Sequence, residues 1–297
     1  MANLALVTQS TSHAAATTTK AMLESKGHTV TFVESANATT SNLTPYDLIV
    51  TCRTTENATH SAVIKAMSDA GKPILCGYGV LTTDSDVTTT PAVVCKIAKS
   101  ERTANTTGDR KIFYADVASP VYDTTGITIP SNVDFAANNS WIASIPKTTA
   151  SPGDIVGSLA SDAVDRGVLF FAAAGSSTYD GGIFGSNVGY CGYLYGGGTE
   201  YTAQAATIVN NMITMLLSLG YGLSGTVKDA SANPLKRKIR AYRRSSGRII
   251  SEATSNGTTG AFLLRVWSTE PHYLVCLDVD SGTKNALIKD RVIPVEL

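Results

Sequence analysis

A cysteine at the end of a short apolar run is the residue best placed for chemistry in this sequence. Residues 72–79 read KPILCGYG, so Cys76 follows an apolar stretch and precedes a turn with two glycines. A buried strand that stops at such a turn delivers its last side chain to the carboxyl edge of a parallel sheet, where open α/β folds bind their ligands. A thiolate at that edge could be the nucleophile of a hydrolase or an amidotransferase.

A catalytic cysteine also needs a base within hydrogen-bond reach. His13 and His60 follow the first and third predicted strands, so either imidazole could meet Cys76 at the same edge of the sheet. Between Cys76 and His272, however, the chain contains no histidine. We therefore predict that Cys76 is a small buried residue and that the chain has no catalytic residue. A hydrolase that uses Cys76 with His13 or His60 is the alternative.

No cofactor or metal site is predicted beside the cysteine. The sequence contains no P-loop and no H-E-x-x-H motif. The five cysteines are an odd number without metal-ligand spacing, and most lie inside apolar runs. We expect free and mostly buried thiols, with no bound cofactor and no metal.

An aromatic segment, residues 175–198, is a candidate contact surface. Glycines alternate there with aromatic side chains, which include Tyr179, Phe184, Tyr190, Tyr193 and Tyr195. A glycine-rich backbone can fold tightly while it presents flat rings to a partner. A loop folded over its own core is the other interpretation of the same pattern.

A row of basic residues lies near the C-terminal end. Lys236, Lys238, Arg240 and Arg244 alternate along one predicted strand, so they share one face of it. Such a row could contact a phosphate backbone or an acidic glycan. We favour a solvated outer face, where lysines discourage edge-to-edge pairing of strands.

The overall charge excludes several classes of partner. Lys and Arg number 24 and so do Asp and Glu, which gives a formal net charge of zero. No global field would therefore draw the protein to nucleic acid or to an anionic membrane, and nucleic-acid binding is not expected. No apolar run reaches the roughly 18 residues of a membrane span, and the first residues lack the features of a signal peptide. We expect synthesis in a cytoplasm and no membrane insertion.

Strand and helix patterns alternate through the first quarter of the chain. The predicted strands are residues 4–8, 28–33, 46–52 and 73–76, and the predicted helices are residues 14–26 and 58–70. This alternation predicts an α/β fold with a doubly wound, flavodoxin-like and mostly parallel sheet, with its first strands in the order 2-1-3-4. Residues 200–219 show the clearest helical period and close this domain.

After residue 222 the apolar period changes from helical to two. Six strand-like runs, separated by turn signals such as Asn233-Pro234 and Asn256-Gly257, predict a small all-β sandwich. We therefore predict two domains, residues 1–222 and residues 223–297.

Two family resemblances follow from short motifs. The strand ending in Cys76-Gly77-Tyr78-Gly79 and residues 118–127 (ASPVYDTTGI) resemble the class I glutamine-amidotransferase-like superfamily, in particular its trehalose-utilisation-like branch. Ser119 stands where that branch has a histidine, and Leu75 stands where the nucleophile turn usually has glycine. The resemblance implies an amidotransferase-like frame without the catalytic histidine.

The second resemblance concerns residues 224–264. The runs SGTVKD, NPL and TGAFLL are similar in order and spacing to the carboxypeptidase-regulatory or transthyretin-like β-sandwich. Modules of that family are appended to other domains and occur in structural proteins of tailed bacteriophages, where they serve presentation and adhesion.

From these features we predict a structural component of a virus particle, such as a tail, baseplate or capsid-associated protein. Its expected location is the virion, and its expected partners are other copies of itself and other virion proteins. One alternative is a cytoplasmic enzyme of the hydrolase or amidotransferase type that uses Cys76. The other is an adhesin that binds a host-surface glycan.

Overall fold

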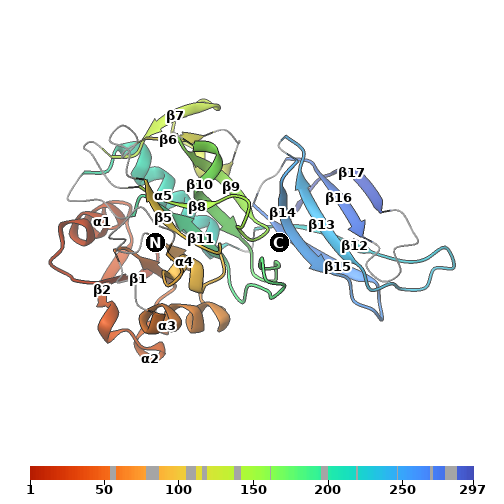
Figure 1. The fold of residues 1–297 in the computed structure, drawn as a ribbon, viewed down its shortest axis with the longest axis horizontal. Helices are drawn as coiled ribbons and strands as arrows, with labels where there is room; N and C mark the ends of the chain where they lie inside the picture. The colour runs from red at the N-terminus through yellow and green to blue at the C-terminus, as the bar shows by residue number, and fades with distance from the viewer. Residues whose placement is uncertain are drawn as a thin grey trace.

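The computed structural model describes most of the chain. The described residues are 1–53, 58–77, 87–104, 112–115, 119–136, 142–160, 162–194, 200–218, 220–245, 247–267, 270–277 and 286–297. They form two bodies, which Figure 1 shows side by side: a main body of residues 1–218 and a C-terminal module of residues 221–297.

Five neighbouring strands of the main sheet run parallel. In sheet order they are β2 (Thr29–Glu34), β1 (Asn3–Thr8), β3 (Leu48–Thr51), β4 (Ile74–Cys76) and β11 (Val188–Cys191). The central strands β3 and β4 are buried along their whole length, which explains their continuous apolar runs. The order of the first four strands is the one expected from the sequence.

The rest of the main sheet is antiparallel, and the predicted fold class is therefore wrong. β10 (Asp162–Ala172) pairs with β11, β9 (Asp154–Leu159) and β8 (Ile142–Pro146), and the sheet continues through β6 (Ile112–Ala115), β7 (Ser131–Asp134) and β5 (Arg102–Ala104). A short connection joins β9 to β10, and so short a connection reverses the chain instead of carrying it across the sheet. The sheet is mixed, rather than doubly wound and mostly parallel.

Helices cover both faces of the parallel half. α1 (Ala14–Ser25) and α5 (Ala203–Leu217) pack on one face, where Leu23 and Met212 share a core with Leu6. α2 (Thr40–Leu43), α3 (Ala58–Asp69) and α4 (Pro91–Val94) pack on the other face, where Ile64 shares a second core with Ile49. Two short 3-10 turns, η1 (Ser35–Asn37) and η2 (Pro120–Tyr122), complete the body. Within the described ranges, no helix has the length and apolar character to span a bilayer.

The C-terminal module consists of two antiparallel sheets around a small core of its own. One sheet has the order β15 (Ala261–Val266), β12 (Tyr221–Thr226), β18 (Val295–Glu296), and the other has the order β14 (Ile249–Thr254), β13 (Lys238–Arg243), β16 (His272–Leu277), β17 (Leu287–Val292). The last predicted run, residues 286–295, is divided between the two sheets at Pro294, which cannot donate a hydrogen bond to a ladder.

Candidate functional site

Cys76 is enclosed in the core, and its thiol is not activated. The residue ends β4 with no exposed surface, on the sheet face that α3 covers. A hydrogen bond with Cys95, burial and the nearby carboxylate of Glu101 raise the pKa of the Cys76 thiol well above its usual value. The thiol therefore stays protonated at neutral pH and offers no accessible surface to a substrate.

Neither predicted base activates this thiol. His13 is the N-cap of α1, where its Nδ1 accepts a hydrogen bond of 3.1 Å from the N–H of Ala15. Burial, and secondarily Arg53, lowers the pKa of His13. α1 packs against the sheet face opposite to Cys76, and His60 lies in the first turn of α3. The hydrogen-bond partner that the structure gives Cys76 is Cys95 rather than an imidazole.

A buried carboxylate that sequence reasoning missed lies on the same side of the sheet. Glu101 is fully buried, and its Oε1 accepts a hydrogen bond of 2.9 Å from the Tyr190 hydroxyl on β11. Burial, followed by the charge of Glu101, raises the pKa of Tyr190 well above its usual value. On β10, Arg166 donates to Ser144 Oγ at 3.0 Å and to the carbonyl oxygen of the same residue at 2.7 Å. These bonds cross-link strands in the interior, and nothing in the sequence around Glu101 marks it as buried.

The predicted aromatic contact segment contributes mainly to the core. Phe184, Tyr190 and Tyr193 are buried, and Tyr195 lies outside the described residues. Tyr193 stacks on Phe135 with 4.4 Å between the ring centroids, inside an aromatic cluster of the antiparallel half. These three buried rings therefore stabilise the main body and are not available to a partner.

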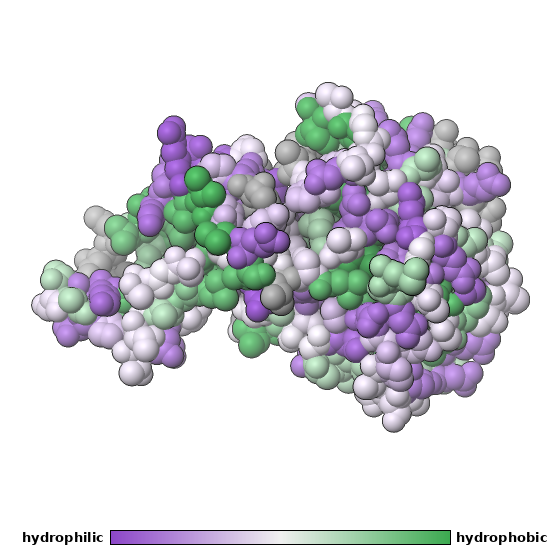
Figure 2. Space-filling view, turned by 180° about the vertical axis from the view of Figure 1, so that it is seen from behind, coloured by the Kyte–Doolittle hydropathy of each residue, from purple (hydrophilic) through white to green (hydrophobic). Residues whose placement is uncertain are grey.

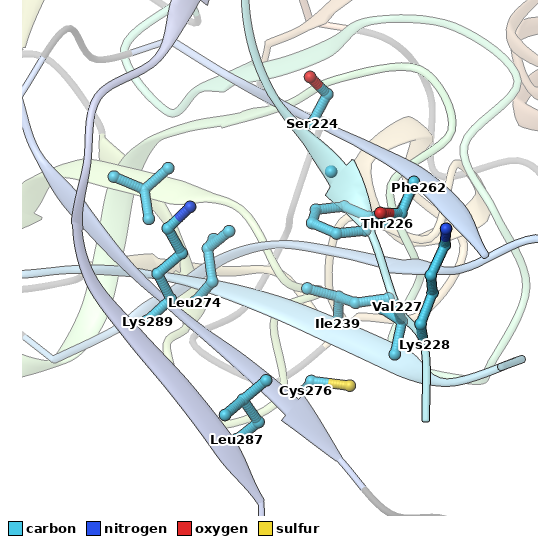
Figure 3. Close-up of a pocket in the computed structure, with 12 residues that line it drawn as sticks. Ser224, Thr226, Val227, Lys228, Ile239, Phe262, Leu274, Cys276, Leu287 and Lys289 are labelled. Atoms are coloured by element: carbon cyan, nitrogen blue, oxygen red, sulfur yellow. The ribbon is translucent and has the colours of Figure 1, made fainter. Parts of the chain in front are cut away.

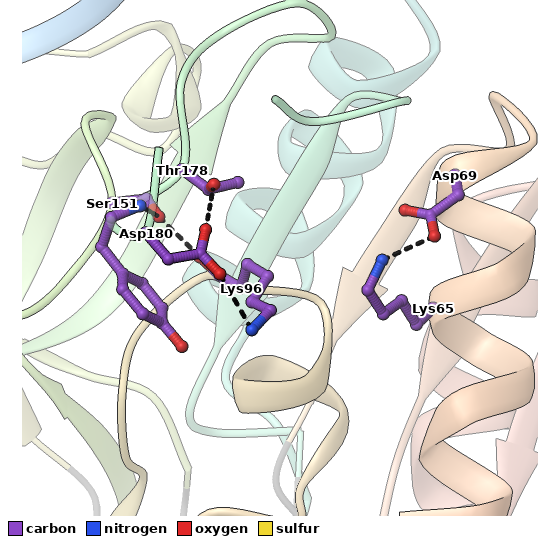
Figure 4. A network of polar contacts seen from close by, with 7 residues as sticks. Lys65, Asp69, Lys96, Ser151, Thr178 and Asp180 are labelled. Atoms are coloured by element: carbon purple, nitrogen blue, oxygen red, sulfur yellow. Dashed lines mark hydrogen bonds and ion pairs between the residues drawn. The ribbon is translucent and has the colours of Figure 1, made fainter. Parts of the chain in front are cut away.

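Tyr179 is half-buried and fixes the tip of the same segment to the main body. Its N–H donates to Ser151 Oγ at 2.8 Å, and its ring lies 5.7 Å from the ammonium group of Lys96. Asp180 pairs with Lys96 at 3.0 Å and accepts a hydrogen bond of 2.6 Å from Thr178, as Figure 4 shows. The bonds from Thr178 and then Lys96 lower the pKa of Asp180 to about 2. The tip is thus held down by polar contacts.

The predicted basic strand face is largely neutralised by acids of the same module. Lys238 and Arg240 both pair with Glu252, at 2.9 and 2.6 Å. Arg244 pairs with an aspartate of β17 at 2.8 Å, and Lys236 is exposed. An anionic ligand on this face would have to compete with these ion pairs.

Buried charges join the C-terminal module to the main body. Arg243 at the end of β13 forms an ion pair with Asp154 at the start of β9, and both side chains are almost completely buried. Arg243 also pairs with Glu270 at 3.1 Å. Desolvation offsets most of the attraction within such a pair, but removal of one partner leaves an uncompensated buried charge. The pair therefore specifies one way of fitting the two bodies together.

Further contacts continue this interface along β14. Ser176 and Ser251 are hydrogen-bonded through their hydroxyl groups at 3.4 Å, and the N–H of Ser177 donates to the carbonyl oxygen of Glu252 at 3.3 Å. The ring of Trp267, which follows β15, is buried in the core of the main body. Polar and apolar contacts together hold the module in place.

His272 lies beside this interface and stays neutral. It faces Arg243 across the β13–β16 ladder and has no exposed surface. Burial, and secondarily the positive charge of Arg243, lowers the pKa of His272 to about 4.

Comparisons with known proteins do not place the chain in a family. No protein-family model and no curated protein sequence matches it. Among solved structures, one match is the "Structure of PurLQS from Thermotoga maritima", with 12% identity and a TM-score of 0.42 over 73% of this chain and 100% of that chain. A likeness of this size carries no statement about function.

The two family assignments drawn from the sequence motifs are therefore wrong. The relation to bacteriophage proteins, which the second assignment implied, is wrong as well. The amidotransferase-like frame implied a parallel sheet, whereas the main sheet is mixed. Its second motif, residues 118–127, contains the short 3-10 turn η2. The motifs are brief runs of common residues, and such runs arise without shared ancestry.

Asp154→Ala should destabilise the protein by about 3 kcal/mol, because Arg243 would lose its buried carboxylate partner. Urea denaturation measures the free energy of unfolding. Glu24→Ala is the matched control, since Glu24 belongs to a largely exposed pair with Lys20, and it should cost at most about 1 kcal/mol. Equal losses in the two variants would contradict the role given to Asp154.

The stability should fall as the pH is lowered from 6.5 toward 4. In this window the unfolded chain protonates His272 while the folded protein keeps it neutral, so protons favour unfolding. A pKa shift of this size in one histidine lowers the free energy of unfolding by an amount on the order of 2 kcal/mol. His272→Gln should show a flatter dependence in urea denaturation at a series of pH values, and an unchanged slope would refute the assignment.

Proposed function

We propose that this chain is a non-catalytic structural protein that works inside a larger assembly. The main body is the scaffold, and the C-terminal module contacts neighbouring copies or other structural proteins. The observation that carries this proposal is the exposed apolar surface on β17 and β18. A virus particle is one assembly of this kind, and its tail, baseplate or capsid would be the place of action.

The apolar surface lies on edge strands of the module. Leu287, Ile288 and Val295 have 70%, 63% and 69% of their surface exposed, and Ile293 between β17 and β18 has 68%. β17 ends one sheet and β18 ends the other among the described strands. Figure 2 shows hydrophobic residues gathered on this module. Exposed apolar edge strands bind other chains, and apolar patches of this kind mark interaction sites.

The buried thiol supports a non-catalytic role. The only cysteine predicted to do chemistry is protonated and enclosed beside Cys95. A nucleophile needs a lowered pKa or an adjacent base, and access for its substrate. The arrangement around Cys76 favours packing over catalysis.

The fixed junction between the two bodies supports a role in assembly. The Arg243–Asp154 pair and the buried Trp267 hold the module in one orientation. A rigid two-body subunit loses little conformational entropy when it joins a particle. A glycan would suit the apolar edge less well than another protein, because sugar hydroxyls require hydrogen-bonding partners.

The assembly role predicts self-association through β17 and β18. Ile288→Lys combined with Val295→Lys should dissociate the oligomer, because buried ammonium groups would oppose the contact. Light scattering coupled to size-exclusion chromatography measures the mass. Ile183→Lys is the control, since Ile183 is 71% exposed on the main body, far from this surface in the sequence. A wild-type protein that is monomeric at every concentration would contradict the proposal, and so would equal effects of the two variants.

The non-catalytic role also predicts an unreactive Cys76. Iodoacetamide at neutral pH should modify Cys276 first, since that residue is partly exposed, and should modify Cys76 only after unfolding in urea. Mass spectrometry of the peptides follows each thiol separately. Rapid labelling of Cys76 in the folded protein would favour the Cys76-dependent enzyme instead.

A further inference from the structure

The C-terminal module contains a cavity between its two sheets. Its volume is about 450 Å³, within the range of roughly 300 to 1,000 Å³ typical of ligand sites. Most of its lining is apolar and includes Val227, Ile239, Phe262 and Leu274. Figure 3 shows these side chains in the space between β12 on one side and β16 and β17 on the other.

The cavity exists because the module core fills only one end of the space between the sheets. Leu223 and Val266 are fully packed at the end near the main body, whereas Val227 and Phe262 are only partly buried. β18 pairs only with the first two residues of β12, Tyr221 and Gly222. Residues 224–226 therefore have no strand partner on that side among the described residues. Gly225 leaves the ring of Phe262 in place, since a Cβ there would meet it at 3.0 Å. Among the described residues, this end of the module is open.

Two ammonium groups flank the apolar space. Lys228 and Lys289 both line the cavity, and Figure 3 shows them on either side of Phe262 and Leu274. Neither lysine has an ion-pair partner within the part of the chain that the structure describes. By contrast, Lys238 on the outer face of the same module pairs with Glu252 at 2.9 Å. The cavity therefore combines an apolar interior with uncompensated positive charge at its rim.

We propose that this cavity binds an amphiphilic anion, namely an unbranched alkyl chain that ends in a carboxylate. The alkyl chain lies against Val227, Ile239, Phe262 and Leu274, where burial of apolar surface stabilises it. The carboxylate lies at the rim beside one of the two lysines, Lys228 or Lys289, and the other lysine adds to the positive potential there. The lysines give the site its selectivity for charge, because an apolar cavity alone does not distinguish an anion from a cation. This binding activity goes beyond the assembly role, and Leu287 of the proposed assembly surface also lines the cavity.

Isothermal titration calorimetry with decanoate, below its micelle concentration, tests the proposal on the full chain. We expect saturable binding of one decanoate per chain and binding of decyltrimethylammonium at least about tenfold weaker, as expected for two partly screened charge interactions. The double variant Lys228→Gln with Lys289→Gln should lose about tenfold in affinity for decanoate by the same reasoning. Lys236→Gln is the matched control, since Lys236 is exposed and does not line the cavity, and it should bind like the wild type.

A second variant tests the position of the alkyl chain. Cys276 lines the cavity and is only partly buried, so Cys276→Phe should fill the space and abolish binding while circular dichroism reports a folded module. Three results would overturn the proposal: non-saturable binding, equal binding of the cation and the anion, or full binding by Cys276→Phe. A fourth result would also overturn the proposal: decanoate binding that appears only in the dissociated Ile288→Lys, Val295→Lys variant. That result would mean that a second copy of the chain occupies the cavity in the oligomer.

Discussion

The buried ion pair between Arg243 and Asp154 is the constraint on which the architecture depends. It joins the end of β13 to the start of β9. The pair thus couples the four-stranded sheet of the module to the antiparallel half of the main sheet. A pair of this kind contributes little net stability, because both charges were well solvated before folding. Its effect is on specificity: any other docking of the two bodies would leave a charge buried without its partner. Glu270, which also pairs with Arg243, and the neutral His272 lie beside this pair.

Buried polar groups in the described part of the chain hold segments of the fold together. The Glu101–Tyr190 bond, the Arg166 bonds to Ser144 and the thiol pair beside them are all enclosed. The pKa of the Tyr190 hydroxyl is raised, chiefly by burial, and that of the Cys76 thiol is raised, chiefly by its hydrogen bond with Cys95, so both groups stay protonated. The apolar edge strands and the lysine-flanked cavity both lie on the C-terminal module. The main body holds the module in place, and the module carries the exposed apolar residues of β17 and β18.

The sequence predicted the elements whose stabilising contacts are local. The buried strands β1, β3 and β4 have apolar runs that only a central parallel strand explains, and α5 has a clear helical stripe. The burial of Cys76 followed from the same pattern. The antiparallel half could not be predicted, because β10 pairs with three strands, and its ladder with β9 has register shifts that depend on tertiary packing. Arg243 and Asp154 lie 89 positions apart, and no local property of either residue indicates the other.

β11 occupies a special place in the main sheet because it is paired with β4 on one side and β10 on the other. Among the described strands it is the single link between the parallel and antiparallel halves. Its Tyr190 lies opposite Cys76 in one ladder and opposite Phe170 in the other, so chain segments more than 100 positions apart must meet before the sheet is continuous. Such non-local pairing slows folding and leaves two strand edges open until it is complete. The continuity of the whole sheet therefore depends on a strand of four residues.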